Sequence, residues 1–382
     1  MPQLLAGRTL EVSAGVVCQD VRDSLGVVAC VVPFNFPAMV PLWTAPIALG
    51  AGNCVILKPS EKVPMTMHRI IKLWERAGGP PGVFQMVNGA VPVVEALCDH
   101  PDVSAVTFVG SSRVAELVAQ RCRAINKRVL ALGGAKNHLV ALPDCDQDMV
   151  VNDILTSAFG SAGQRCMAAS ALVLVGDTGP LLESICTAAA ALQPGSGVGE
   201  IGPIIDGAGG ERIMRYIAEA EAAGTQVLLD GRGWLTDGAG DGGCFIGPTI
   251  LLHASAEDAA MQDEIFGPVL SVIKVTTADG ALAVERANPH GNAACVYTQS
   301  GASGEYFASR FNSAMIGVNI GIPVPREPFS FGGLYGTKSK YGDMDITADG
   351  AMEFFTSRRK ITTKWSSVRT QSPRQLDFQG WF

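Results

Sequence analysis

Cys166 is the residue of this chain whose surroundings best suit covalent chemistry. It follows the small-residue loop 160–164 and the cation Arg165, whereas the other cysteines stand mostly among apolar neighbours. A neighbouring positive charge lowers the pKa of a thiol and so favours the thiolate, which is the nucleophilic form. The context therefore indicates a sulfur that attacks a carbonyl and carries an acyl group. Taken alone, a cysteine is more often a small buried apolar residue.

Asn35 is a second candidate, because it lies in the segment Pro33-Phe34-Asn35-Phe36-Pro37 just after a predicted strand. Ligands bind at the carboxyl ends of the strands in parallel sheets. The side-chain amide could donate a hydrogen bond to an oxyanion. A buried asparagine that merely ties a loop would explain this segment equally well.

Two further predicted strands end at polar residues that could bind a nucleotide. Lys58 and Glu61 could hydrogen-bond ribose hydroxyls, although a polar turn that opens a helix is an equal alternative. Ser111 could offer its hydroxyl and amide to a phosphate at a helix N-terminus, or be an ordinary N-cap. The GxGxxG fingerprint of a standard dinucleotide-binding loop does not occur in the sequence.

Glu264 and Phe266 precede another predicted strand, residues 269–275. Glu264 could hold a ribose diol while Phe266 packs on a flat ring, or both could belong to a structural turn. The five histidines show no metal-ligand spacing, and no Ser/His/Asp arrangement can be inferred. We therefore predict no metal site.

The composition limits the classes of protein to which the chain can belong. Its 382 residues, 47% hydrophobic and 17% charged, suffice for two or three domains with large cores. The net charge of -7 argues against a nucleic-acid partner, because phosphate binding needs a basic surface. The ten cysteines contain no CxxC pair, so we expect reduced thiols rather than a disulfide framework.

An uncharged stretch, residues 26–57, is long enough to cross a bilayer. It contains several prolines, which break helices, and it begins with a strand-like run rich in valine. We therefore predict a buried strand, loop, helix and strand in place of a membrane span, and no membrane partner.

Short apolar runs alternate with helix-length stretches between residues 27 and 132. This alternation predicts a parallel sheet covered on both faces. The predicted strands are 27–32, 54–57, 84–87, 105–109 and 128–132, and the predicted helices are 38–51, 64–77, 91–97 and 114–123.

The same pattern restarts at residue 137. The predicted strands are 138–141, 171–175, 226–229, 269–275, 293–298 and 315–319, and the predicted helices are 149–159, 181–192, 211–223 and 279–287. Residues 231–243 are expected to form an exposed loop, because they are rich in glycine and aspartate. Near the ends, residues 9–17 and 19–23 could form a hairpin, and residues 360–365 alternate as a strand.

In this order, the segments resemble the aldehyde dehydrogenase superfamily, most closely its CoA-acylating semialdehyde dehydrogenases. The motifs are PFNFPAM (33–39), KPSE (58–61), FVGS (108–111), GAKNH (134–138), FGSAGQRCMA (159–168), GPTI (247–250) and EIFGPV (264–269). The resemblance runs from about residue 4 to residue 365. It implies an α/β fold with a doubly wound parallel-sheet NAD domain, a catalytic domain of related topology and an oligomerisation arm.

The resemblance also implies a division into domains. We expect an oligomerisation hairpin (1–25), an NAD-binding domain (26–134), a catalytic domain (135–345), a return segment with an oligomerisation strand (346–366) and a loose tail (367–382). Family members carry roughly a hundred or more residues before the position that matches Met1, the size of most of a domain, so truncation is expected. A homo-oligomer, dimer or tetramer, is implied, mitochondrial in eukaryotes or cytoplasmic in bacteria.

Carried over residue by residue, the resemblance makes Cys166 the nucleophile, and Asn35 the oxyanion hole together with the backbone N–H of Cys166. Arg165 stands where this branch is thought to hold the acidic end of its substrate, which suits the fork of a guanidinium. The residues assigned to NAD are Phe34, Lys58, Glu61, Lys62, Ser111, Gly133, Glu264 and, from its own segment, Phe266.

One departure from the family concerns the release of the acyl group. Hydrolytic members carry a glutamate general base in an ELGG segment, which here reads Ala131-Leu132-Gly133-Gly134. Without this glutamate, the attack of water on the thioester lacks a general base. The thiol of coenzyme A needs less assistance to attack the same thioester. The resemblance implies NAD-dependent oxidation and decarboxylation of methylmalonate or malonate semialdehyde, as in valine, thymine or inositol catabolism, with the propionyl or acetyl group passed to coenzyme A. A hydrolytic dehydrogenase and a non-catalytic truncated subunit are the alternatives.

Overall fold

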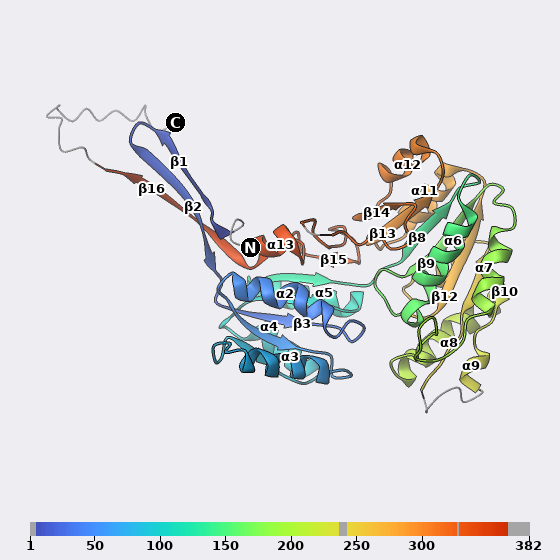
Figure 1. Cartoon of the computed structure of the whole chain (residues 1–382), viewed down its shortest axis with the longest axis horizontal. Helices are drawn as coiled ribbons and strands as arrows, with labels where there is room; N and C mark the ends of the chain where they lie inside the picture. The colour runs from blue at the N-terminus through green and yellow to red at the C-terminus, as the bar shows by residue number, and fades with distance from the viewer. Residues whose placement is uncertain (1–4, 237–242, 327, 366–382) are drawn as a thin grey trace.

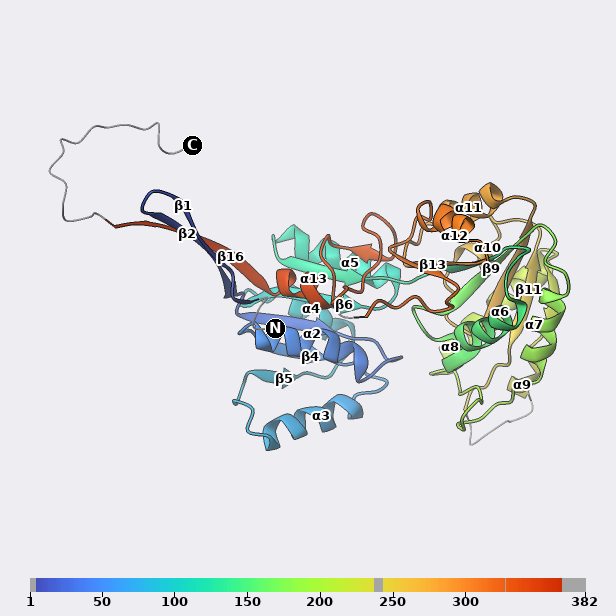
Figure 2. The same cartoon turned by 45° about the horizontal axis from the view of Figure 1, so that its top comes forward.

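The computed structural model describes residues 5–236, 243–326 and 328–365, which form three β-sheets. Two of the sheets are covered by helices and make two bodies that lie side by side (Figure 1). The third sheet forms a narrow arm that projects away from both bodies, as the turned view in Figure 2 also shows. The arm, the first body and the second body follow one another along the long axis of the molecule.

The first sheet is mainly parallel. Its strands are β3 (Val27–Val31), β4 (Cys54–Lys58), β5 (Phe84–Met86), β6 (Val103–Val109), β7 (Arg128–Leu132) and the antiparallel β15 (Lys340–Tyr341). They lie in the order β15-β7-β6-β3-β4-β5. The chain starts in the middle at β3, moves outward through β4 and β5, and returns to the other side of β3 with β6. This doubly wound order confirms the predicted fold and places a topological switch point between β3 and β6.

Helices cover both faces of the first sheet. Alternate residues of each strand point to opposite faces, so each face packs against its own helices. Val28 and Cys30 pack with α2 (Met39–Gly50) and α3 (Met65–Arg76). Ala29 and Val31 pack on the other face with α4 (Val91–Asp99) and α5 (Ser112–Ala124). The uncharged stretch 26–57 therefore forms β3, α2 and β4, and α2 leaves Met39 and Leu42 exposed on its outer face. Within the described ranges, no helix combines the length and the apolar character needed to span a bilayer.

The second sheet repeats this architecture. Its strands are β8 (Asn137–Ala141), β9 (Ala169–Val175), β10 (Gln226–Leu229), β11 (Thr249–His253), β12 (Val269–Val275), β13 (Ala293–Tyr297) and β14 (Met315–Val318), in the order β10-β11-β12-β9-β8-β13-β14. All pair in parallel except the edge strand β10. One face packs against α6 (Gln147–Ile154), α7 (Leu181–Ala190) and α8 (Gly207–Ala222), and the other against α11 (Ala278–Ala287) and α12 (Gly301–Ala308).

Several element predictions need correction. The helix expected at 149–159 ends at Ile154 and continues as a π-helical turn, η1 (Leu155–Phe159). The sequence did not predict β11, α10 (Ala259–Gln262), α12 or α13 (Ala348–Phe354). The loop 231–243 contains the short α9 (Gly233–Thr236), and its residues 237–242 lie outside the described part. The chain rejoins the first sheet at β15, before the boundary expected at residue 345. The predicted tail also lies outside the described residues.

The arm is an antiparallel sheet of β1 (Arg8–Ser13), β2 (Val16–Ser24) and β16 (Thr356–Lys364). The early hairpin and the late strand are thus confirmed, but their bounds were wrong. The hairpin turns at Gly15, which has φ +71° and donates its N–H to Glu11 Oε1 at 2.9 Å. Glycine adopts this left-handed conformation without steric cost, and it places the turn earlier than predicted.

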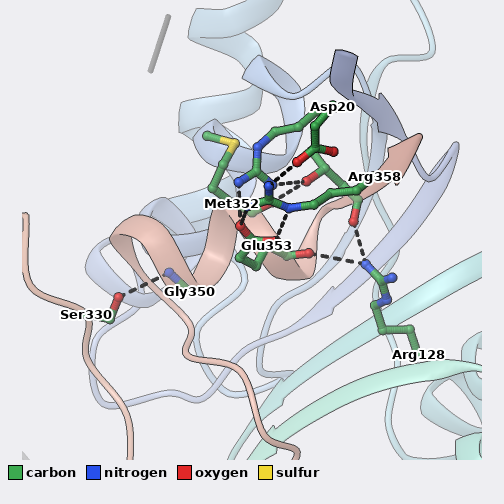
Figure 3. A network of polar contacts seen from close by, with 9 residues as sticks. Asp20, Arg128, Ser330, Gly350, Met352, Glu353 and Arg358 are labelled. Atoms are coloured by element: carbon green, nitrogen blue, oxygen red, sulfur yellow. Dashed lines mark hydrogen bonds and ion pairs between the residues drawn. The ribbon is translucent and has the colours of Figure 1, made fainter. Parts of the chain in front are cut away.

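A network of ion pairs fixes the root of the arm to the first body (Figure 3). Glu353 of α13 binds Arg358 of β16 and Arg22 of β2, and Arg358 also binds Asp20 at 2.6 Å. Arg128, at the start of β7, donates to the carbonyl oxygens of Phe354 at 2.7 Å and Thr356 at 2.8 Å. Hydrogen bonds from Arg358 and then Arg22 lower the pKa of Glu353 to about 2. The carboxylate of Glu353 is therefore the centre of this network.

The network makes stability depend on pH in acid. Because the pKa of Glu353 falls from 4.5 to about 2 on folding, its contribution is complete above about pH 4.5 and is lost as the pH falls towards 2. We expect Glu353→Gln to lower the free energy of unfolding at neutral pH by about 1 kcal/mol, since solvent screens this partly exposed pair. The loss should shrink between pH 4.5 and 2 in urea unfolding followed by circular dichroism.

The matched control is Glu95→Gln, because Glu95 is exposed and its partner Arg121 keeps Asp99. This variant should change the free energy of unfolding by only a few tenths of a kcal/mol at any pH. Equal effects of the two variants would contradict a special role for Glu353.

Candidate active site

A cavity of about 880 Å³ lies between the two bodies, at the carboxyl ends of the strands of the first sheet. Its wall includes residues 33–36, which follow β3, and residues 110–111, which follow β6. It therefore opens at the switch point of the doubly wound sheet, the position where such folds bind ligands. The second body closes it with Ile205, Asp206 and Arg212.

The cavity brings together every predicted site residue except Arg165. Those that line it are Phe34, Asn35, Lys58, Glu61, Lys62, Ser111, Gly133, Cys166, Glu264 and Phe266. These residues come from segments that are far apart in the sequence and from both bodies. Their convergence gives the candidate nucleophile, the candidate oxyanion donor and the candidate nucleotide-binding residues one common space.

One end of the cavity is an apolar slot between α4 and α5. Val91 and Val94 line it from α4, and Val114, Leu117 and Val118 line it from α5. Side chains of this kind on two facing helices suit a flat, apolar ring. The sequence had not singled out any of these five residues, because valine and leucine on a helix indicate core packing in general.

The N-terminus of α5 faces the same cavity. Ser111 occupies the N-cap position, as the simpler interpretation expected, but its side chain makes no capping hydrogen bond within the described chain. A hydroxyl and the backbone N–H groups of a first helical turn together suit a phosphate group.

Lys58, Glu61 and Lys62 form a polar wall beside this helix end. Lys58 donates to Glu61 Oε2 at 3.0 Å. Although burial acts to raise it, the pKa of Glu61 is lowered by hydrogen bonds from its own backbone N–H and from Lys58. Lys62 reaches across to the second body, where it pairs with Asp206, and its Nζ lies 5.6 Å from the centre of the Phe34 ring. The Lys62–Asp206 pair thus joins the two bodies at the edge of the cavity.

The loop that carries Cys166 has an unusual backbone. It follows the π-helical turn η1, and Ser161, Ala162 and Gly163 have φ values of 55°, 53° and 66°, all left-handed. This conformation costs Ser161 and Ala162 about 1 kcal/mol or more each, because both residues carry a Cβ atom. Gly163 is required for a second reason, because a Cβ there would lie 2.1 Å from the carbonyl oxygen of Gly267. Strained backbone of this kind is common next to reactive residues.

The surroundings of Cys166 favour the protonated form of its thiol. Burial and the charge of Glu264 raise its pKa to about 12, against hydrogen bonds from the N–H groups of Cys166 and Met167 and against the charge of Arg165. The prediction that Arg165 would leave the thiol with a low pKa was therefore wrong. Arg165 acts in the expected direction, but desolvation of the sulfur is the larger effect.

Glu264 is a half-buried acid at the cavity wall. Burial raises its pKa to about 7, although it accepts a hydrogen bond from the N–H of Ala135 at 2.9 Å. A Cβ on Gly134 would lie 2.2 Å from Glu264 Oε2, so the glycine lets the carboxylate approach the backbone. At neutral pH this carboxyl group can therefore hold or release a proton close to the sulfur.

Asn35 reaches from the first body to the loop that carries Cys166. Its Nδ2 donates to the carbonyl oxygen of Gln164 at 3.0 Å. The amide thus ties a loop, as the simpler interpretation expected, while the side chain also lines the cavity beside Cys166. An amide group carries two hydrogens, so one is left to donate towards a ligand.

Arg165 is placed differently from the other candidates. Its guanidinium donates to the carbonyl oxygens of Thr156 and of Ser157, the latter at 3.2 Å. Among the described residues, its Nε is buried without a hydrogen-bond partner. Arg165 lines a hollow of only about 10 Å³ together with Asn137 and Gly163. The sequence could not foresee that backbone carbonyl oxygens hold Arg165, and its predicted role in substrate binding stays a prediction.

Two buried asparagines near Cys166 were not recognised from the sequence. Asn137 and Asn292 both donate to the carbonyl oxygen of Cys166, at 2.8 Å and 3.0 Å. Asn137 stands inside the GAKNH motif, which was a usable signal. Asn292 carried none, because only the folded sheet brings it to the loop.

Comparisons with known proteins agree with this geometry. A model of the aldehyde dehydrogenase family matches residues 1–361. Malonate-semialdehyde dehydrogenase 2 of Geobacillus kaustophilus is 42% identical over 370 residues, which cover 95% of this chain and 75% of that protein. Malonate-semialdehyde dehydrogenase of Halalkalibacterium halodurans is 39% identical over 369 residues, which cover 95% and 75% of the two chains.

Solved structures give the same picture. The methylmalonate-semialdehyde dehydrogenase of Oceanimonas doudoroffii superposes with a TM-score of 0.93 at 40% identity, covering 96% of this chain and 76% of that one. A protein of Sinorhizobium meliloti 1021, assigned as a methylmalonate-semialdehyde dehydrogenase and complexed with NAD, has a TM-score of 0.92 at 35% identity. The match covers 75% of that chain and 96% of this one.

The left-handed backbone before Cys166 predicts opposite effects for two small substitutions. Ser161→Gly should raise the free energy of unfolding by about 0.5 kcal/mol, because it removes the steric penalty of an exposed residue. Gly163→Ala should lower the free energy of unfolding by more than about 2 kcal/mol, because its Cβ meets Gly267. Urea unfolding of both variants measures this. If Ser161→Gly lowered the free energy of unfolding as much as Gly163→Ala does, the proposed steric strain at Ser161 would be contradicted.

Proposed function

The chain belongs to the aldehyde dehydrogenase family, and we propose that it oxidises malonate or methylmalonate semialdehyde with NAD and passes the acyl group to coenzyme A. The observation that carries the proposal is the convergence of Cys166, Asn35 and Glu264 with the nucleotide-binding candidates in one cavity. The names of its relatives, malonate- and methylmalonate-semialdehyde dehydrogenases, favour this substrate class.

The residues of the cavity fit NAD. The apolar slot between α4 and α5 suits the adenine ring, the Lys58–Glu61 pair suits ribose hydroxyls, and Ser111 with the N-terminus of α5 suits a phosphate. Phe34 and Phe266 meet edge to face at 5.9 Å on the way to Cys166 and offer ring surfaces. When bound, NAD supplies the acceptor for the hydride of the aldehyde.

The chain's own residues then carry out the first half of the reaction. The thiol of Cys166 must lose its proton. We propose Glu264 as the acceptor, in addition to the contact with NAD that its motif implies, because its charge acts on the sulfur and its pKa is about 7. The sulfur bonds to the carbonyl carbon, and the oxygen takes the electron pair of the C=O bond. The second amide hydrogen of Asn35 and the N–H of Cys166 donate to this oxyanion. Loss of a hydride restores the C=O bond and leaves a thioester on Cys166.

Release of the acyl group distinguishes coenzyme A from water as the acceptor. In a malonyl or methylmalonyl chain the β-carboxylate leaves as CO2, and the carbon that held it takes up a proton. The coenzyme A thiolate then attacks the thioester and expels the Cys166 thiolate. Ala131 supports this route, because it is a fully buried member of the apolar cluster beneath α4 and α5 and offers water no base.

One observation favours hydrolysis as a second candidate function. Glu264 has a pKa of about 7 and lies close enough to Cys166 for its charge to raise the pKa of the thiol. A carboxylate of this kind could take a proton from water as well as from a thiol. The two functions differ in what Glu264 does after the thioester has formed.

Steady-state NADH formation from malonate semialdehyde tests the acceptor. We expect the rate with coenzyme A to exceed the rate without it by at least about tenfold, since the thiol deacylates Cys166 and water lacks a base. Cys166→Ala should lower the rate with coenzyme A by at least about a thousandfold, because no thioester can form.

Equal rates with and without coenzyme A would contradict the proposal. They would favour the hydrolytic dehydrogenase instead, because water would then release the acyl group as fast as coenzyme A does. An unaffected Cys166→Ala variant would contradict both functions, because both need the thioester.

Arg165 does not line the cavity, and only the family resemblance supports the proposal that it binds the carboxylate of the substrate. We expect Arg165→Gln to raise the KM for malonate semialdehyde by about tenfold or more, because a charge-assisted pair is lost, and to leave the KM for propanal unchanged. Arg165→Lys keeps the charge but not the planar fork. Its KM for malonate semialdehyde should therefore lie between the values of the unchanged protein and of Arg165→Gln. An equal rise of KM for both aldehydes would show that Arg165 only supports the η1 carbonyls.

A further inference from the structure

The carbonyl oxygen of Cys166 is held by two buried side chains. Asn137 Nδ2 donates to it at 2.8 Å, and Asn292 Nδ2 donates to it at 3.0 Å. Asn137 is only 3% exposed and Asn292 only 7%. A carbonyl oxygen has two lone pairs, so two donors saturate it and fix its direction. The backbone on the C-terminal side of the nucleophile is therefore held from outside its own loop.

The two asparagines also hold each other. Asn292 Nδ2 lies 3.2 Å from Asn137 Oδ1, which also accepts the N–H of Ala293 at 3.1 Å. Asn137 Nδ2 donates to the carbonyl oxygen of Ala168 as well, at 2.8 Å. Asn137 begins β8, and Asn292 immediately precedes β13, the parallel neighbour of β8. The pair is thus built on the second sheet and gives the loop a rigid support.

The planar peptide bond carries this constraint to the sulfur. In a trans peptide the C=O of Cys166 and the N–H of Met167 point in opposite directions. Holding the oxygen on one side therefore sets the direction of the N–H on the other. The N–H of Met167 acts to lower the pKa of the Cys166 thiol, because a donor directed at the sulfur favours its charged form.

We propose that Asn137 and Asn292 are positioning residues that aim the N–H of Met167 at the sulfur of Cys166. They act on the nucleophile through its own peptide group, and neither of them lines the cavity. The inference rests on the proposed function only in taking Cys166 as the nucleophile.

Two charged groups also act on the same sulfur. The negative charge of Glu264 raises the pKa of the Cys166 thiol, and the positive charge of Arg165 lowers it. Asn292 makes no hydrogen bond to either group among the described residues, whereas Asn137 is close in sequence to Ala135, which binds Glu264. Asn292 is therefore the better residue to change, because its loss leaves both charges in place.

The test is the rate at which iodoacetamide alkylates Cys166 in the free protein at a fixed, mildly alkaline pH, followed by mass spectrometry of the Cys166 peptide. Only the thiolate reacts, so the rate follows the thiolate fraction. We expect Asn292→Leu to lower this rate by about tenfold, the equivalent of about one pKa unit. Asn292→Ser keeps one donor hydrogen and should lower it less, by about threefold.

The matched control is Asn53→Leu. Asn53 is 1% exposed and donates both amide hydrogens to carbonyl oxygens, those of Ala48 at 2.9 Å and Phe355 at 3.0 Å. It immediately precedes β4. The cavity lies at the other end of this strand, where Lys58 lines it. This variant should be destabilised as Asn292→Leu is, with the alkylation rate of Cys166 unchanged.

An unchanged or faster alkylation rate in Asn292→Leu would overturn the proposal, and so would an equal fall in Asn53→Leu. If Asn292→Leu does not fold, the milder Asn292→Ser decides by the same criterion. Iodoacetamide needs neither a semialdehyde nor coenzyme A. A failure of this test is therefore distinguishable from a failure of the proposed function.

Discussion

The site depends on one geometric constraint, that parallel strands of a sheet all end at the same edge. In the first sheet this edge collects the residues that follow β3, β4 and β6, and the reversal of strand order between β3 and β6 opens a crevice there. The second sheet supplies the nucleophile loop, which Asn35 ties to the first body. The cavity therefore exists only where the two bodies meet.

The electrostatics of the cavity oppose the charged form of Cys166. The burial that excludes water from Cys166 also disfavours its charged form, and the same burial leaves Glu264 close to half-protonated at neutral pH. The backbone N–H groups of Cys166 and Met167 act in the opposite sense without adding a charge. The hydrogen bonds that set the backbone of the loop therefore matter as much as the charges near the sulfur.

Much of the fold and of the site followed from local sequence. Runs such as those that form β3 and β7 are apolar on both faces, which only a covered parallel sheet explains, and polar residues at strand ends marked the cavity. What the sequence could not provide depends on contacts between distant segments. Asn292 reaches the carbonyl oxygen of Cys166 only because β13 pairs with β8, and the left-handed loop before Cys166 packs Gly163 against the carbonyl oxygen of the distant Gly267.

The construction of the arm has a consequence for synthesis on the ribosome. Asp20 of β2 and its partner Arg358 of β16 are 338 residues apart in the chain. At roughly 5–20 residues per second, β2 therefore waits about 20–70 s before the strand that covers its edge has been made. During that time β1 and β2 form an isolated hairpin, which by itself is only marginally stable in water. The hairpin of the arm is thus translated long before the strand that completes its sheet.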